Sequence, residues 1–194
     1  HNQDTFLEHR KQQESKYFDS VDTTNPLSSI LTIELNTTEL CNRTCVFCPR
    51  HDSEVYPNRN LHMSVEDAEV IAKNLSNFNY QGKLSFSGYS ENFLNKKFVE
   101  IISVMRKHLK DNFFECNTNG DFLKEDYAKK LFINGLDLLY INLYDGIEQR
   151  EEFEKIMVDI DESNYKYRAH YSQDDYGLFI NNRGGNIDWL GFDE

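Results

Sequence analysis

Three cysteines lie close together in the segment CNRTCVFC, with three residues between Cys41 and Cys45 and two between Cys45 and Cys48. Gaps this short allow three sulfur atoms from one loop to reach adjacent corners of an iron–sulfur cube. A [4Fe-4S] cluster takes four ligands, so one iron is left open to bind a small molecule. The spacing therefore predicts a chemically reactive cluster rather than a purely structural one.

Two other interpretations of these cysteines stay open from the residues alone. A zinc site normally adds a fourth Cys or His at finger-like spacing, and His51 would complete the pattern C-x3-C-x2-C-x2-H. The three thiols could also be unrelated buried cysteines. Cys116 stands alone in the apolar run NFFEC, which favours a buried core thiol for this residue.

Length and charge restrict the fold and the partners. The chain has 194 residues, enough for one domain with a substantial core. Its formal net charge is −12 and it has no basic run, so we expect no nucleic-acid partner. No apolar stretch approaches the ~20 residues of a membrane span, and no signal-peptide pattern opens the chain. From these two features we expect a soluble, cytoplasmic protein without membrane contact. Clustered thiols agree with a reducing compartment, because exposed cluster thiolates would be oxidised elsewhere.

Segments typical of strands and helices alternate along the chain. Alternating apolar and polar residues predict a first strand at 30–35, which leads straight into the cysteine loop. Ser64, followed by Asp67 three residues later, forms a helix-capping pattern. The later strands are expected at 83–87, 113–117, 138–143 and 165–171, and the helices at 65–78, 96–109, 125–133 and 151–160.

This alternation requires a parallel sheet with right-handed crossovers, and hence an α/β fold. Five or six β/α units fall short of the eight that close a complete barrel, so the expected architecture is an incomplete parallel barrel. In such sheets functional residues gather at the C-terminal ends of the strands, where the cysteine loop lies. We expect a polar arm at 1–27, the core at 28–186 and a tail at 187–194.

The cysteine loop resembles the cluster loop of the radical S-adenosylmethionine (radical SAM) superfamily. In that superfamily three cysteines hold the cluster, and the amino and carboxylate groups of SAM chelate the fourth iron. The resemblance assigns Cys41, Cys45 and Cys48 to the cluster, and it places Phe47 beside the SAM adenine. It implies the same incomplete barrel fold and covers roughly residues 30–186.

The segment SGYSEN at 87–92 is similar to the Gly-Gly-Glu-Pro segment of radical SAM enzymes, which meets the SAM amino group. Glu91 would keep the carboxylate, Gly88 and Ser90 would be the small residues, and Asn92 stands in place of the usual proline. From the residues alone, a turn with an exposed acid explains the segment equally well.

Two further strand ends resemble superfamily motifs. Asn119 lies in a Thr-Asn-Gly run after the third strand, and Asn142 lies where a polar residue usually hydrogen-bonds the SAM ribose or carboxylate. On the fifth strand Arg168 shares a face with His170, and its guanidinium could pair with the SAM carboxylate. A plain β-turn at Asn119 and a surface salt bridge for Arg168 remain the alternatives.

The run NNRGGN at 181–186 resembles the Asn-Arg-Gly-Gly segment after the core in radical SAM enzymes with a SPASM or twitch auxiliary-cluster domain. In those proteins a cysteine-rich extension follows, whereas this sequence stops at Glu194 without a further cysteine. We expect such an extension to be missing from this sequence, in preference to a naturally minimal enzyme.

The resemblance implies an enzyme that reductively cleaves SAM, leaving methionine and a 5′-deoxyadenosyl radical that abstracts hydrogen from a small-molecule or peptide substrate. It also implies an electron donor such as flavodoxin or ferredoxin, and it leaves a homo-oligomer open. A small glycyl-radical activating enzyme and a deazaguanine-forming synthase are alternatives within the superfamily. From another class, a non-catalytic iron–sulfur or zinc module that binds a protein partner is the alternative.

Overall fold

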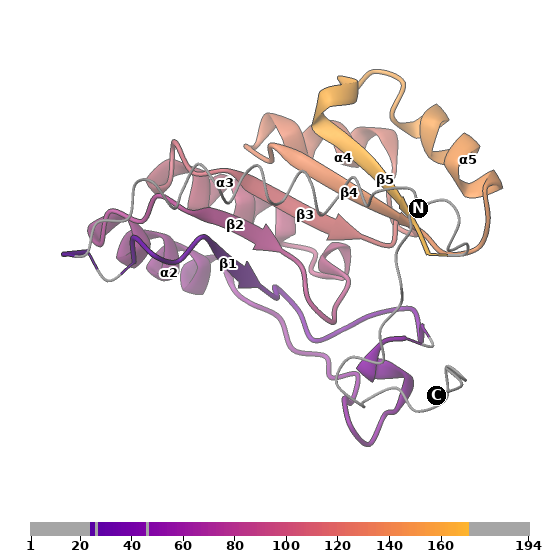
Figure 1. Ribbon diagram of the computed structural model, residues 1–194, viewed down its shortest axis with the longest axis horizontal. Coiled ribbons are helices and arrows are strands. Elements are labelled where there is room, and N and C mark those ends of the chain that lie inside the picture. Colours follow the sequence, from indigo (N-terminus) through magenta and orange to yellow (C-terminus); the bar gives the residue numbers. More distant parts are fainter. Residues whose placement is uncertain (1–23, 26, 46, 171–194) are drawn as a thin grey trace.

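The computed structural model describes residues 24–25, 27–45 and 47–170. Its centre is one sheet of five strands in the order β1-β2-β3-β4-β5, with every neighbouring pair parallel (Figure 1). The strands are β1 Thr32–Leu35, β2 Lys83–Phe86, β3 Phe114–Thr118, β4 Leu138–Leu143 and β5 Tyr165–Ala169. In the described part of the chain β1 and β5 are the two edges of the sheet and do not pair, so the barrel stays open. The predicted incomplete parallel α/β barrel is confirmed.

Helices connect consecutive strands, and α2, α3 and α4 lie behind the sheet in the view of Figure 1. The helices are α2 Val65–Asn77, α3 Phe98–His108, α4 Glu125–Ile133 and α5 Glu148–Ile156. Three short 3-10 turns are η1 Pro49–His51, η2 Asn92–Leu94 and η3 Glu162–Asn164. None of the helices in the described ranges has the length and apolar character needed to cross a bilayer.

The two faces of the sheet differ because successive side chains of a strand point to opposite sides. One face is apolar and packs in the core with the helices, where Leu84, Phe86, Phe114, Leu139 and Ile141 are completely buried. The other face carries charged and polar side chains and lines a cavity. The residues of that inner face are Thr32, Glu34, Lys83, Ser85, Ser87, Glu115, Asn117, Tyr140, Asn142, Arg168 and His170.

Local signals fix several element boundaries as expected. The Ser64 hydroxyl accepts from the Asp67 N–H at 3.0 Å, and the Asp67 side chain accepts from the Ser64 N–H, which is the predicted capping box. Helix α4 ends at Asn134 and Gly135, and Gly135 has φ +109°, a conformation that favours glycine.

The prediction for α5 was wrong by several residues, because the helix begins at Glu148 and ends at Ile156. The side-chain Oε1 of Gln149 accepts from the backbone N–H groups of Tyr144 at 2.7 Å and Asp145 at 2.8 Å, so the turn after β4 is held closed and the helix starts directly behind it. Strand β1 is two residues shorter than expected at its start, and β3 is displaced by one residue.

Three sequence predictions concern residues outside the described ranges. They are the polar arm up to residue 23, the Asn-Arg-Gly-Gly run at 181–186 and the tail at 187–194.

Candidate cluster and cofactor site

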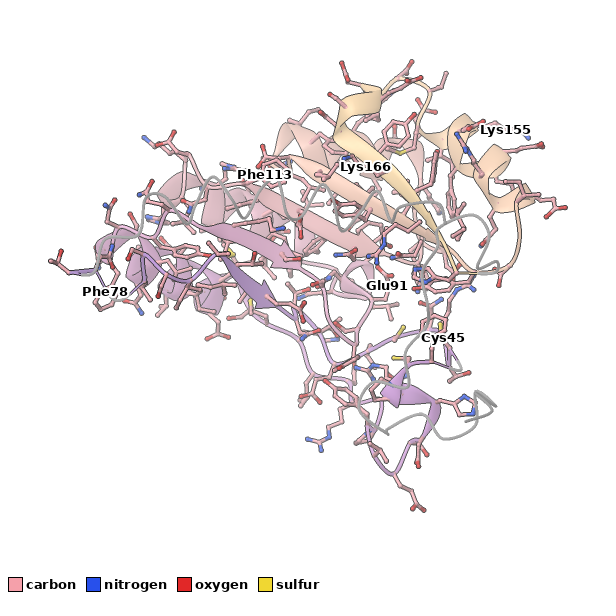
Figure 2. The ribbon with its side chains drawn as sticks, in the orientation of Figure 1. Cys45, Phe78, Glu91, Phe113, Lys155 and Lys166 are labelled. Atoms are coloured by element: carbon pink, nitrogen blue, oxygen red, sulfur yellow. The ribbon has the colours of Figure 1, made fainter. Side chains whose placement is uncertain are left out.

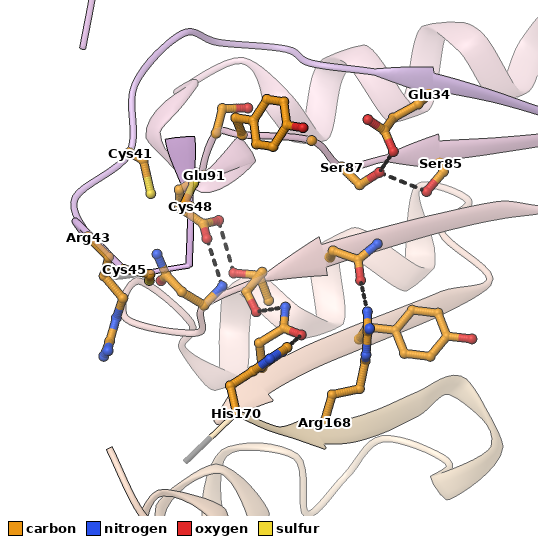
Figure 3. A pocket seen from close by; sticks show the side chains of 18 of the residues that line it. Glu34, Cys41, Arg43, Cys45, Cys48, Ser85, Ser87, Glu91, Arg168 and His170 are labelled. Atoms are coloured by element: carbon orange, nitrogen blue, oxygen red, sulfur yellow. Dashed lines mark hydrogen bonds between the residues drawn. The ribbon is translucent and has the colours of Figure 1, made fainter. Parts of the chain in front are cut away.

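A cavity of about 480 Å³ lies on the inner face of the sheet and reaches the cysteine loop at the C-terminal ends of the strands (Figure 3). Cys45 and Glu91 both lie at this end of the molecule (Figure 2). All ten residues proposed from the sequence line the cavity: Cys41, Cys45, Phe47, Cys48, Gly88, Ser90, Glu91, Asn119, Asn142 and Arg168. The structure thus brings together residues from the ends of five strands, while what each of them binds stays a prediction.

The three clustered thiols are free and half-buried. Their loop is held by backbone contacts: the Cys48 N–H donates to the Cys45 carbonyl at 2.9 Å, and the Asn58 side chain both accepts from the Cys41 N–H and donates to the Cys41 carbonyl, each at 2.9 Å. Burial raises the pKa of Cys41, and burial with the neighbouring thiols raises the pKa of Cys45 to about 11. Metal binding would displace these protons, because thiolates are the ligands.

The donor set fits an iron–sulfur cube better than a single ion. Among the described residues, no group of three His, Cys, Asp or Glu side chains is gathered around one metal position. A zinc site needs such a gathering, whereas in a cube each thiolate binds a different iron. His51, the fourth ligand of the zinc interpretation, does not line the cavity, and its Nδ1 lies 3.5 Å from the Thr44 carbonyl. Three thiols on the wall of an open cavity therefore fit the cluster.

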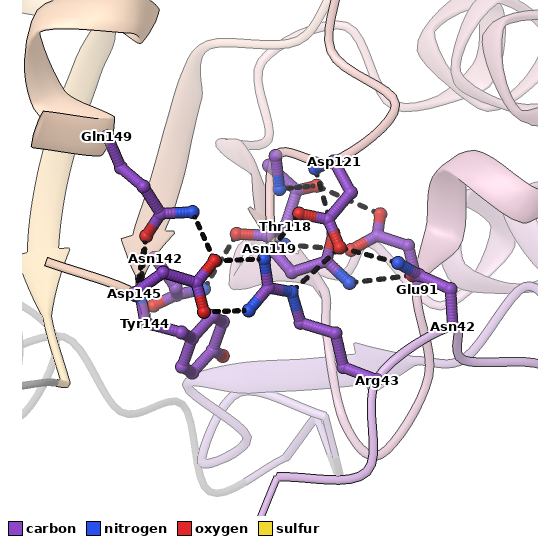
Figure 4. Close-up of polar contacts among 11 residues, drawn as sticks. Asn42, Arg43, Glu91, Thr118, Asn119, Asp121, Asn142, Tyr144, Asp145 and Gln149 are labelled. Carbon is purple, nitrogen blue, oxygen red and sulfur yellow. Dashed lines mark hydrogen bonds and ion pairs between the residues drawn. The ribbon is translucent and has the colours of Figure 1, made fainter.

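Arg43, inside the cysteine loop, ties this loop to the ends of β3 and β4 (Figure 4). Its Nε and Nη2 donate to Asp121 at 2.7 and 2.6 Å, and its Nη1 and Nη2 donate to Asp145 at 2.8 and 2.6 Å. Asn42 adds a bond to Asp121 at 2.5 Å and accepts from Asn119 at 2.8 Å. These bidentate, charge-assisted contacts position the loop over the strand ends.

This network of Arg43, Asn42 and the two aspartates could not be identified from the sequence. Its only local signals were an arginine between two of the cysteines and an aspartate just past each of two strand ends. Nothing in the spacing of Arg43, Asp121 and Asp145 indicates that they meet.

Glu91 is buried, with 2% of its surface exposed, so the alternative of a turn with an exposed acid is wrong. Its Oε1 accepts from the Phe93 N–H at 3.1 Å and the Thr118 hydroxyl at 2.9 Å, and its Oε2 accepts from the Asn119 N–H at 2.8 Å. Burial raises the pKa of Glu91 to about 7, although these three hydrogen bonds favour the carboxylate. One carboxyl group thereby joins the ends of β2 and β3, and Oε2 retains capacity for a second donor.

Gly88 and Ser90, the small residues of the same turn, both contact Asn36. Gly88 has φ +114°, and a Cβ there would lie 2.4 Å from the Asn36 Oδ1. The Ser90 hydroxyl donates to that Asn36 oxygen at 2.8 Å. The turn after β2 therefore packs closely against the segment that follows β1.

Three rings stack at the cavity wall near the ends of β4 and β5. The ring centroids of Tyr144 and His170 lie 4.9 Å apart, those of Phe47 and His170 5.5 Å, and those of Phe47 and Tyr144 5.8 Å. His170 Nε2 lies 3.0 Å from the Asn142 Oδ1, and the Asn142 amide donates to the Thr118 carbonyl at 2.9 Å. Tyr144 and its stacking were missed from the sequence, where only Phe47 carried a signal.

The family model of the radical SAM superfamily matches residues 35–167. This match covers more than half of the sequence, and the chain belongs to the radical SAM superfamily. The superfamily uses a [4Fe-4S] cluster and S-adenosylmethionine, so both predicted cofactors are confirmed at the level of the family. The closer likeness to SPASM or twitch enzymes stays a prediction.

Two curated relatives are similar to this chain. An S-adenosyl-L-methionine-dependent 2-deoxy-scyllo-inosamine dehydrogenase of Niallia circulans is 25% identical over 164 residues, which cover 84% of this chain and 62% of the relative. A probable GTP 3′,8-cyclase of Saccharolobus islandicus is 33% identical over 124 residues, covering 64% of this chain and 37% of the relative. The chain therefore matches less than two thirds of the length of either protein.

Solved structures confirm the fold. The crystal structure of BtrN in complex with AdoMet and 2-DOIA matches with a TM-score of 0.69 at 24% identity, covering 81% of this chain and 62% of BtrN. BtrN in an open conformation matches with a TM-score of 0.56 at 22% identity, covering 72% of this chain and 56% of that chain.

Proposed function

We propose that this chain is the core of a radical SAM enzyme in which Cys41, Cys45 and Cys48 hold the [4Fe-4S] cluster. The observation that carries the proposal is that these thiols and the polar ends of the strands face one cavity in a chain of this family. When bound, the cluster and SAM supply one-electron reduction and hydrogen-atom abstraction. A small acidic or flavin-bearing electron carrier, such as ferredoxin or flavodoxin, would supply the electron.

The turn after β2 is suited to the amino group of SAM. The Glu91 Oε2 accepts one internal hydrogen bond and has room for another, so an ammonium or amine donor can pair with it. Such a donor would favour the ionised form of Glu91, against the burial that raises its pKa. Gly88 and Ser90 allow this turn to pack closely against Asn36, and the backbone N–H of Asn119 donates to Glu91 Oε2, which fixes the carboxylate in place.

The opposite wall is suited to the nucleoside and the carboxylate. Phe47, stacked with Tyr144 and His170, offers ring faces on which an adenine base can lie. Asn142 is oriented by Thr118 and His170 toward the cavity, and Arg168 holds its guanidinium on the inner face, 3.3 Å from the Asn117 Oδ1. In this proposal Asn142 and Arg168 hydrogen-bond the SAM ribose or carboxylate.

The rest of the inner face favours a small polar substrate over an apolar one. Lys83 and Glu115 form a largely buried ion pair at 3.0 Å, and the Ser87 hydroxyl donates to Glu34 at 2.7 Å. Hydroxyl and amine groups of a substrate could exchange hydrogen bonds with this row of charges and hydroxyls. The similar dehydrogenase is named for 2-deoxy-scyllo-inosamine, which supports a small-molecule substrate for this chain as well.

Anaerobic reconstitution with iron and sulfide tests the proposal by absorption spectroscopy. The protein is expected to show a broad absorption band at about 400 nm that dithionite bleaches, because a redox cluster is being reduced. Metal analysis of the same sample should give iron and sulfide together. A colourless protein that instead retains stoichiometric zinc would contradict the proposal and favour the zinc-module alternative.

A further inference from the structure

Arg50 is a buried cation directly behind the cysteine loop, in the 3-10 turn η1, with 5% of its surface exposed. Its Nε donates to the Tyr89 carbonyl, its Nη2 to the Glu39 carbonyl at 2.5 Å, and its Nη1 to the Asn58 Oδ1 at 3.1 Å. The guanidinium carbon also lies 4.6 Å from the centre of the Tyr56 ring. The side chain is therefore fixed in place.

All these partners are neutral. None of the ion pairs found in the described residues includes Arg50. Arg43 in the neighbouring cysteine loop differs, because two aspartates compensate its charge. A buried charge is costly unless an opposite charge lies near it, and buried charges in proteins are usually paired. Among the described residues, the buried guanidinium of Arg50 thus has no carboxylate within ion-pairing distance.

Arg50 lies next to the cysteine loop, where a bound cluster would bring negative charge. The Asn58 Oδ1 accepts from Arg50 and from the Cys41 N–H, so one atom bridges the guanidinium and the backbone of a proposed cluster ligand. Cys48 lies two residues before Arg50 in the chain. The guanidinium is therefore adjacent to the loop that would carry the cluster, on a side shielded from solvent.

We propose that Arg50 is the fixed counter-charge of the cluster and that it favours the reduced state. The inference rests on the proposed function, because it requires the cysteines to hold a cluster. A [4Fe-4S] core with its cysteine thiolates is negatively charged, and reduction adds a further electron. A nearby cation that solvent cannot screen lowers the free energy of the reduced cluster more than that of the oxidised cluster. Arg50 thereby raises the reduction potential.

A redox titration of cluster-loaded protein, followed by the EPR signal of the reduced cluster, tests this role without any measurement of turnover. At the midpoint potential of the wild type, Arg50→Gln is expected to lower the ratio of reduced to oxidised cluster about tenfold, equal to a shift of ~59 mV for one electron. Arg50→Lys keeps the charge and should stay within about twofold of wild type. Arg59→Gln is the matched control, because it removes the same charge from an exposed side chain of the same connection between β1 and α2.

A second variant keeps Arg50 itself in place. Asn58→Asp would set a carboxylate on the Arg50 Nη1, now 3.1 Å from the Asn58 oxygen, and is expected to shift the ratio in the same direction. Loss of iron uptake in Arg50→Gln but not in Arg50→Lys would also support a role of the charge. The inference is overturned if Arg50→Gln titrates like Arg59→Gln, or if Arg50→Lys changes as much as Arg50→Gln. Absence of a cluster from the wild type would instead refute the proposed function.

Discussion

Replacement of any one of Cys41, Cys45 and Cys48 with Ala is expected to abolish stoichiometric [4Fe-4S] incorporation and SAM cleavage together. Each thiolate would hold a different iron of the cube, so losing one leaves a second iron without a protein ligand. Iron and sulfide analysis after reconstitution, with product analysis on the same sample, measures both effects. The residual content should be a small fraction of one cluster per chain.

Cys116→Ala is the matched control for these variants. Cys116 is completely buried in β3, packs in the hydrophobic core and does not line the cavity. Its replacement should reduce stability by on the order of 1 kcal/mol while cluster content stays unchanged. Full iron content in a variant that lacks all three clustered cysteines would show that the ligands lie elsewhere.

Glu91 variants should produce the second large effect. Glu91→Ala would leave the Phe93 N–H, the Thr118 hydroxyl and the Asn119 N–H without their acceptor in a buried position. Each orphaned donor costs roughly 1–3 kcal/mol, so this variant is expected to be strongly destabilised. The role in SAM binding is better measured with Glu91→Gln, which keeps the size of the side chain and removes its charge.

For Glu91→Gln we expect the affinity for SAM to fall about tenfold or more, because a charged hydrogen bond to the amino group is lost. The absorption of the cluster should stay unchanged. Calorimetric titration of reconstituted protein with SAM measures the affinity. An affinity equal to that of the wild type would restrict Glu91 to holding the two strand ends together.

The raised pKa of Glu91 also predicts how stability depends on pH. Its folded pKa of about 7 lies above the ordinary value of 4.5, so the folded state binds this proton more tightly than the unfolded state. The contribution to the free energy of unfolding is therefore present at low pH and is lost as the pH rises through about 7. Between pH 5 and pH 8 the loss should be about 2 kcal/mol.

Denaturant unfolding of the cluster-free protein across this pH range measures the effect. The pH-dependent loss should be absent from Glu91→Gln, whose side chain does not titrate. Parallel pH profiles for the wild type and this variant would show that the buried carboxyl is not the group responsible.

Much of the fold could be predicted because its signals are local. Helix α4 and strand β4 have the predicted bounds, since a capping Asn-Gly ends the helix and a run that is apolar except for Asn142 marks the strand. The start of helix α5 could not be predicted correctly. It depends on hydrogen bonds from the backbone N–H groups of Tyr144 and Asp145 to the Gln149 side chain, which no local sequence pattern indicates.

The candidate site could be assembled from the sequence because parallel strands bring their C-terminal ends to one edge. Cys41, Glu91 and Arg168, far apart in the chain, therefore line one cavity. Ion pairs between residues that are far apart in the sequence could not be predicted in this way. Arg43 meets aspartates 78 and 102 residues away. Likewise, no local pattern distinguishes the buried, uncompensated charge of Arg50 from an ordinary exposed arginine.

The most direct test of the central claim is product analysis of SAM incubated with the cluster-loaded, dithionite-reduced protein. Liquid chromatography with mass spectrometry would quantify methionine and 5′-deoxyadenosine in the same sample. The proposed function predicts that both accumulate in equal amounts, and that neither forms without dithionite or with the Cys45→Ala protein. SAM that remains intact beside a fully loaded and fully reduced cluster would contradict it.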